Sequence, residues 1–275
     1  MTVADVGDEV LVERDGSVAW VRLNRPDRLN AMNAALMDGL VLRLRELADD
    51  PEVRCVALTG QGRAFCAGGD VDLMSDRERR GSPTDAVGPR MDHQVRVLDR
   101  RFEAIELLSS MPKPTVAMVR GWALGGGLAL ALACDVRFVA EDARLGMGFL
   151  ARAVSGTFGM AYLLTSILGS AKAREFALLR EWVGGADAVA MGLATSVHPA
   201  DELEEHTQEV CRRLAAGPTF AYGKFKDSVN FALGADLRRV MHYEAVNSRL
   251  TSLSDDARES VAAYREKRPP RFTGT

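Results

Sequence analysis

The sequence predicts an α/β core followed by a helical C-terminal region. Three short apolar runs that resemble buried strands alternate with helical patterns, and from about residue 157 onward the pattern is nearly all helical. The chain has 275 residues, 47% of them hydrophobic and 27% charged, which suits one large domain with or without a small appendage. We therefore expect strands joined by right-handed crossovers over residues 1–200 and a helical region over residues 201–275.

The first elements follow from hydrophobic spacing. EVLVER and SVAWVRLN flank Asp15-Gly16, a pair typical of a hairpin turn. Apolar side chains at helical spacing then predict a helix with one buried face, formed by Leu36, Met37, Leu40, Val41, Leu44 and Leu47. RCVALTG is the first predicted buried strand, and the loop QGRAFCAGGD follows it.

The next segment is charged and interrupted. Residues 75–92 contain Gly and Pro among charged side chains, and we predict an irregular excursion there. A second amphipathic helix follows, with Val95, Leu98, Phe102 and Ile105 on its apolar face. PTVAMVRG and DVRFVA are the other two predicted strands, and the apolar helical run LALALAC lies between them.

Composition excludes several classes of protein. A net charge of −3 gives no basic surface for nucleic acid. The acidic N-terminal residues predict no signal peptide, and neither uncharged stretch, residues 121–134 or 153–171, suits a membrane span. Four scattered cysteines and four histidines lack metal-ligand spacing, so we expect no metal, reduced thiols and a cytoplasmic location.

Two glycine-containing junctions follow predicted strands. One runs from Gly60 to Asp70 and the other from Gly121 to Gly127. Glycines permit close backbone approach to a ligand and expose N–H groups at a helix start, although they equally suit tight packing of a helix on a sheet. Nucleotide-binding motifs do not fit, because Phe65 replaces the third glycine of a dinucleotide fingerprint and Leu128 replaces the P-loop lysine. There is no GxSxG nucleophile elbow.

Taken in order, several motifs resemble the crotonase (enoyl-CoA hydratase/isomerase) superfamily. They are LNRP with RLNA at residues 23–31, AFCAGGD at 64–70, GWALGGG at 121–127, ACDVRFVAEDA at 133–143, and YREKR with Phe272 near the C-terminus. The resemblance implies a crotonase-like spiral of ββα units with a helical C-terminal trimerisation region. It also implies a homotrimer or dimer of trimers, and an acyl-CoA thioester as ligand, with coenzyme A part of the substrate and no separate cofactor.

By the same resemblance, the backbone N–H groups of Gly69 and Gly126 form an oxyanion hole for the thioester enolate. Such a preorganised donor contributes roughly 3 kcal/mol to transition-state stabilisation. Further positions resemble substrate-binding residues: Arg28, Ala31, Ala67, Asp70, Val71, Trp122, Phe149, Thr157, Tyr264 and Lys267. Among these, Tyr264 and Lys267 match residues that approach the nucleotide end of CoA, often from a neighbouring subunit.

The positions that carry catalytic carboxylates in related enzymes hold other residues here. Family hydratases have glutamates at the positions of Ala129 and Phe149, and some isomerases and dehalogenases have an aspartate at the position of Thr157. No Asp or Glu occurs from Ala143 to Arg174. Because loss of a catalytic acid or base costs ~10²–10⁴-fold in rate, the two-glutamate hydratase mechanism is disfavoured.

Three activities remain compatible with these residues. The first is an enzyme of this family that stabilises an enolate without the usual glutamates. The second is a decarboxylase of malonyl-type thioesters, in which Arg152 or Ser155 orients the departing carboxylate, and the third is a non-catalytic acyl-CoA binder. Residues 216–220 and the C-terminal EKRPPRFTG resemble isomerases of phenylacetyl-CoA breakdown, and an apolar pocket for a bulky acyl group is expected from Met147, Phe149, Phe158 and Met160.

Overall fold

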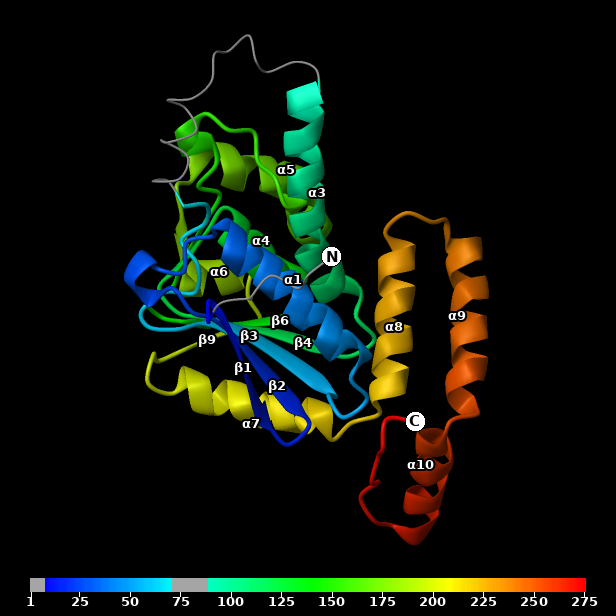
Figure 1. Cartoon of the computed structure of the whole chain (residues 1–275). Coiled ribbons are helices and arrows are strands. Elements are labelled where there is room, and N and C mark those ends of the chain that lie inside the picture. The colour runs from blue at the N-terminus through cyan, green and yellow to red at the C-terminus, as the bar shows by residue number, and fades with distance from the viewer. Residues whose placement is uncertain (1–7, 71–88) are drawn as a thin grey trace.

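The computed structural model describes residues 8–70 and 89–275 and contains two β-sheets with helices around them (Figure 1). The larger sheet has the order β1-β2-β3-β4-β6-β9, formed by Val10–Asp15, Val18–Leu23, Cys55–Gly60, Thr115–Val119, Val136–Ala140 and Ser196–His198. Only β1 and β2 pair antiparallel in this sheet, and the other neighbours are parallel. The smaller sheet has the order β5-β7-β8, formed by Trp122–Leu124, Arg144–Gly146 and Val183–Gly184.

The helices connect these strands and then continue alone to the C-terminus. Those of the first part are α1 (Ala34–Asp49), α3 (Pro89–Ser110), α4 (Gly126–Ala133), α5 (Met160–Leu179), α6 (Gly185–Met191) and α7 (Leu203–Ala215). The last three are α8 (Thr219–Ala232), α9 (Leu237–Ser252) and α10 (Asp255–Glu266). Short 3₁₀ turns occupy Pro26–Arg28 and Leu150–Arg152. Among the described residues no helix is long and apolar enough to cross a membrane.

The predicted α/β class, the predicted strands and the first helix are confirmed, with local corrections. The hairpin loop is Gly16-Ser17 rather than Asp15-Gly16, because Asp15 still pairs with Val18 as the last residue of β1. Helix α3 begins at Pro89, inside the segment 75–92 that was predicted to be irregular, whose first part lies outside the described residues. The prediction of nearly all helix after residue 157 missed β8 and β9, and β5 and β7 were missed too, because each has only two or three residues.

The larger sheet is covered on both faces, which explains the continuous apolar runs in its central strands. Every residue of β3 and β4 is buried, as expected for parallel strands with helices on each side. Helix α1 buries its whole predicted apolar face on one side, together with α4. On the other side α7 packs over Trp20, Cys55 and Phe138 through Leu203 and Cys211. Figure 1 shows α1 and α7 on opposite faces of this sheet.

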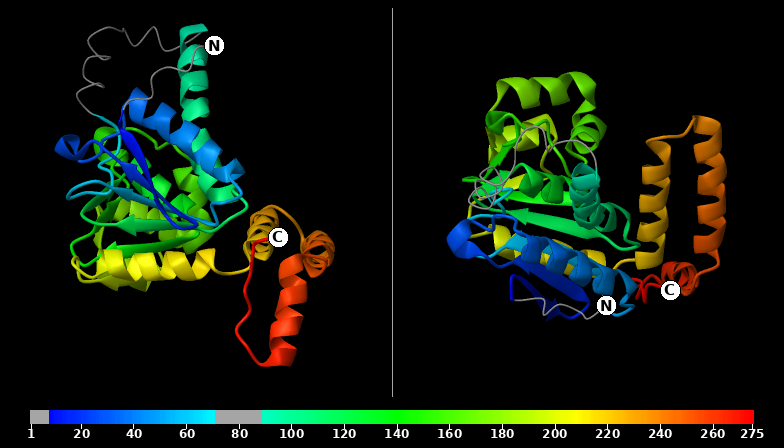
Figure 2. Two further views of the ribbon diagram at one scale, coloured as in Figure 1. Left: turned by 60° about the horizontal axis from the view of Figure 1, so that its bottom comes forward. Right: turned by 45° about the horizontal axis from the view of Figure 1, so that its top comes forward.

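The last helices stand away from the sheets. Helices α8 and α9 form an antiparallel pair beside the core, and α10 lies at the end of the pair where α8 begins and α9 ends (Figures 1 and 2). Helix α7 still lies against the larger sheet, so α8 is the first helix after it that stands away from the sheet. The predicted domain boundary at residue 200 stays a prediction.

One buried lysine joins α8 to the core. The Lys226 ammonium donates to the carbonyl of Leu108 (2.8 Å) and to the carboxylate of Asp135 (3.0 Å). The same Asp135 oxygen accepts from the Thr115 backbone N–H (2.7 Å) and hydroxyl (3.0 Å) at the start of β4. The side chain of Lys226 is only 9% exposed, so its charge depends on these partners.

We expect Lys226→Met to lower the free energy of unfolding by about 2 kcal/mol, because charge-assisted hydrogen bonds are lost in a water-poor site. The measurement is chemical denaturation followed by circular dichroism. The matched control is Lys224→Met, whose ion pair with Asp227 (3.1 Å) is about 30% exposed at both partners and is worth about 0.5 kcal/mol or less. Equal losses in the two variants would contradict the anchoring role of Lys226.

Candidate active site

The two glycine junctions lie side by side in the structure. Cys66 N–H donates to the Trp122 carbonyl (2.8 Å), and Leu124 N–H donates back to the Cys66 carbonyl (3.0 Å). On its other side the first junction pairs with the segment before α1, through Met32 N–H to the Gly68 carbonyl (2.7 Å) and Asp70 N–H to the Met32 carbonyl (3.1 Å). The loop of the first junction therefore runs between two other backbone segments.

Several glycines are needed for this close approach alone. A Cβ at Gly121 would overlap the Arg63 carbonyl oxygen, and one at Gly127 would overlap the Cys66 carbonyl oxygen. At Gly68, where φ is +88°, a Cβ would lie 2.8 Å from the Leu124 carbonyl oxygen. The packing interpretation of the glycines thus holds at these three positions.

Gly69 and Gly126 are the two glycines predicted to donate their N–H groups to a ligand. Both hydrogen bonds of the Met32 bridge are made by the neighbours of Gly69, so the Gly69 N–H takes no part in that bridge. Gly126 is the first residue of α4, where N–H groups have no partner within the helix and the helix dipole favours negative charge. Neither N–H is used by the bridge or helix to which its residue belongs, and the donor role of the two amides stays a prediction.

Buried polar side chains hold the loop before α1 against the first junction. Asn30 is fully buried, with φ 56°, and its amide donates to the carbonyls of Gln61 (3.0 Å) and Ala64 (2.8 Å). The Asp70 carboxylate, 8% exposed, accepts from the Arg25 guanidinium at 2.9 Å. In the described structure Asp70 thus serves to fix the loop beside Gly69.

The predicted CoA-contacting residues fall in two places. Ala31 and Ala67 are half-buried in adjoining segments, since Ala67 N–H donates to the Leu29 carbonyl (3.0 Å), and Arg28 is exposed on the turn just before them. Val71 lies outside the described residues. Tyr264, 86% exposed, and Lys267 lie at the end of α10, away from α4 in both views of Figure 2. One protomer therefore does not bring these last two residues to the glycine junctions.

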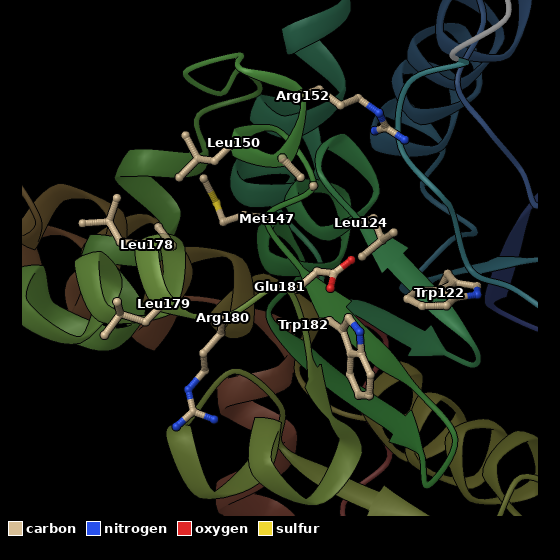
Figure 3. A pocket seen from close by; sticks show the side chains of 13 residues that line it. Trp122, Leu124, Met147, Leu150, Arg152, Leu178, Leu179, Arg180, Glu181 and Trp182 are labelled. Atoms are coloured by element: carbon tan, nitrogen blue, oxygen red, sulfur yellow. The ribbon is translucent and has the colours of Figure 1, made fainter.

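One pocket is lined in part by the second junction, and another pocket adjoins it. The first, which we call the Trp122 pocket, has a volume of about 640 Å³ and includes Trp122, Leu124, Arg152, Glu181 and Trp182 in its wall (Figure 3). The second, the Thr157 pocket, has a volume of about 750 Å³ and includes Ser155, Thr157 and Met160. They share Met147, Leu150, Ala177 and Leu178, so they lie next to each other. Gly69 and Gly126 are not among the described residues that line either pocket.

Trp122 contributes packing to its pocket. The Arg144 guanidinium lies between the rings of Trp122 (4.9 Å) and Trp182 (4.6 Å), and the two indoles meet edge to face at 6.3 Å. This arrangement ties β5 and β7 to the residue before β8, with Trp122 half-buried and Trp182 exposed.

Other residues occupy the three carboxylate positions of related enzymes. Ala129 is fully buried within α4, and Thr157 lines its pocket. The Phe149 ring lies against Gly125, 3.4 Å from the place of a Cβ there. The Thr157 pocket has no carboxylate among the described residues that line it, although Tyr162 and Arg174 belong to its wall.

The structure adds Glu181, which sequence reasoning missed. It is the only carboxylate among the described residues that line either pocket, and Figure 3 shows it between Met147, Leu124 and Trp182. It lies beyond the segment from Ala143 to Arg174, which has no acid, and the pairing of β8 with β7 brings this exposed side chain to the wall of the Trp122 pocket. Because β8 has only two residues, the sequence gives no signal of its pairing with β7.

Cys66, which lies within the first junction, is not a candidate nucleophile. All four cysteines are free and buried, and burial raises the pKa of the Cys66 and Cys134 thiols to about 12. No group of three or more metal-ligating side chains occurs among the described residues.

Comparison with known proteins agrees with this architecture. The family model for enoyl-CoA hydratase/isomerase matches residues 13–275. The chain is 33% identical over 266 residues to "Probable enoyl-CoA hydratase echA8" of Mycobacterium tuberculosis, covering 97% of this chain and 98% of that protein. It is 34% identical over 265 residues to 1,2-epoxyphenylacetyl-CoA isomerase of Escherichia coli, covering 96% and 98%.

Solved structures lead to the same family. An enoyl-CoA hydratase subunit I from Geobacillus kaustophilus superimposes with a TM-score of 0.86 at 31% identity, covering 97% of this chain and 98% of that one. An enoyl-CoA hydratase from Bacillus anthracis gives 0.87 at 29% identity, covering 97% and 100%. The expected crotonase-like fold is thereby confirmed, and the chain belongs to the crotonase superfamily, the enoyl-CoA hydratase/isomerase family.

Proposed function

We propose that this protein binds an acyl-CoA thioester and stabilises its enolate with the backbone N–H groups of Gly69 and Gly126. The observation that supports the proposal is the backbone pairing of the two junctions, which makes the segment of Gly69 and the segment that leads into α4 neighbours. A thioester oxygen held there gains charge as the α-proton leaves, and preorganised donors stabilise that charge best in a water-poor site.

The proposed chemistry does not use two glutamates. Ala129, Phe149 and Thr157 carry no acid, and the carboxylate of Asp70 is paired with Arg25. The remaining carboxylate at the site, Glu181, is the candidate for any proton transfer that the reaction needs. Since the described walls of both pockets are largely apolar and carry two indole rings, a bulky or aromatic acyl group is the favoured substrate class.

The relatives bear on the choice of reaction. Among them are proteins named enoyl-CoA hydratase and one named 1,2-epoxyphenylacetyl-CoA isomerase. An isomerase that forms and reprotonates an enolate needs fewer acid and base groups than a hydratase that also activates water. We therefore favour isomerisation of a conjugated or aromatic thioester over hydration.

We also propose that copies of the chain assemble as a trimer or as a dimer of trimers. The last three helices expose large apolar side chains that a lone protomer leaves in water, among them Phe225, Val229, Leu237, Met241, Leu253 and Val261. In such an assembly, Tyr264 and Lys267 of one protomer contact the nucleotide end of a CoA bound to a neighbouring protomer. We also propose that the protein is cytoplasmic, because its four unpaired thiols remain reduced in that compartment.

The oxyanion assignment is tested with acetoacetyl-CoA, whose enolate absorbs in the near ultraviolet. Binding to the wild-type protein should raise the enolate fraction at constant pH, because two N–H donors stabilise the anion. Gly126→Pro should lower the ionisation constant of the bound ligand about a hundredfold, the typical effect of losing one such donor. Proline is tolerated at the first position of a helix, so the fold should persist.

The control is Gly126→Ala, which keeps the N–H and adds a Cβ that meets mainly the movable end of Met32. It should retain more of the enolate signal than the proline variant, because both substitutions add a Cβ and only proline removes the N–H. Similar enolate fractions in the wild-type and proline proteins would remove Gly126 from the oxyanion role. A wild-type protein that binds the ligand without any enolate signal would instead indicate a non-catalytic acyl-CoA binder.

The missing glutamates are tested with crotonyl-CoA, by loss of the conjugated thioester absorbance. We expect hydration to be ~10²–10⁴-fold slower than in a hydratase that carries both glutamates. Hydration at the rate of such an enzyme would contradict this account, and loss of that rate in Glu181→Gln would then identify the acid that replaces them. Release of CO₂ from malonyl-CoA or methylmalonyl-CoA would favour the decarboxylase.

A further inference from the structure

Two apolar side chains cover Gly126 in the described structure. A Cβ placed on Gly126 would overlap the terminal methyl of Met32 and would lie 3.2 Å from the Met32 sulfur. The Phe158 ring lies at the same place, with its Cδ2 3.2 Å from that position. The Cα of Gly126, next to its amide nitrogen, is therefore covered by a thioether and a phenyl ring.

Phe158 is fixed in this position. Its φ is 58°, a left-handed conformation that is strained for a bulky side chain, and glycines with φ 110° (Gly156) and 65° (Gly159) flank it. The ring packs edge to face on Phe102 of α3, with centroids 5.1 Å apart, and Phe158 is only 7% exposed. The loop thus turns this ring inward, although its neighbours Thr157 and Met160 line the Thr157 pocket.

Met32 is movable by contrast. Its backbone is held by the two hydrogen bonds to Gly68 and Asp70, but the side chain is unbranched, partly buried and free to change rotamer. A ligand that reaches the Gly126 amide has to displace the Met32 methyl while the Phe158 ring stays in place.

We propose that Met32 and Phe158 determine which acyl groups the site accepts, by restricting the space at the thioester α-carbon. The inference rests on the proposed oxyanion role of Gly126. An oxygen that accepts from this N–H puts the atoms bonded to the carbonyl carbon within contact distance of the two side chains, and Phe158 belongs to the segment that lines the acyl side. The site therefore selects thioesters that are unbranched at the α-carbon and permits bulk, an aromatic ring included, farther along the chain.

The test compares butyryl-CoA with isobutyryl-CoA by isothermal titration calorimetry. The two acyl groups are isomers that differ only in branching at the α-carbon, and neither has a double bond to hydrate, so affinity is measured without turnover. The wild-type protein should prefer butyryl-CoA. Met32→Ala and Phe158→Leu should each reduce that preference roughly fourfold, the value of accommodating one methyl group.

Phe138→Leu serves as the control, because Phe138 is a similarly buried phenylalanine (5% exposed) on the other face of the larger sheet and should leave the preference unchanged. Circular dichroism establishes that each variant is folded, and Met32→Ala decides the matter alone if Phe158→Leu does not fold. An unchanged ratio in a folded Met32→Ala protein, or a wild-type protein without a preference, overturns the inference. A wild-type protein that binds neither thioester overturns the proposed function itself.

Discussion

The close approach of two backbone segments, residues 63–69 and 121–127, is the constraint on which the site depends. Carbonyl oxygens of one segment occupy the space where side chains of the other would be, so Gly121 and Gly127 have no room for a Cβ. That contact restricts how the two segments, and with them Gly69 and the start of α4, can lie relative to each other. The surrounding elements position the two segments. Both segments follow strands of the larger sheet, β3 and β4, and Asn30 and Asp70 hold the loop of the first segment in place.

Periodicity predicted the elements whose stability is local or whose burial is complete. The apolar runs of β3, β4 and β6 and the buried face of α1 were apparent because many consecutive residues repeat the same pattern. The short strands β5, β7, β8 and β9 were not, since two or three residues carry no period and these strands form only through partners far along the chain. The turn of the hairpin was misplaced by one residue because Asp15-Gly16 and Gly16-Ser17 are both acceptable turn pairs.

The candidate site likewise has one part that can be predicted from single segments and one part that cannot. The resemblance of single motifs predicts Gly69 and Gly126 as oxyanion donors and other residues at three acid positions, because each can be judged from one segment, and both stay predictions. The sequence does not indicate Glu181 and Met32, because they come to their places only through tertiary pairing, of β8 with β7 and of Met32 with Gly69. In the proposed function, the site depends on glycine backbone and apolar side chains more than on titratable groups, so the shape of the site determines its selectivity.

The buried ammonium of Lys226 also has a consequence for the order of folding. Its acceptors come from the end of α3, the start of β4 and the residue before β6, and they meet only after the α/β core has packed. Helices α8 and α9 therefore gain their anchor late. Until then their apolar side chains, Phe225 and Leu237 among them, are exposed and can contact other incompletely folded chains. A high local concentration of newly made chains thus favours aggregation through this helical pair before it favours any ordered assembly.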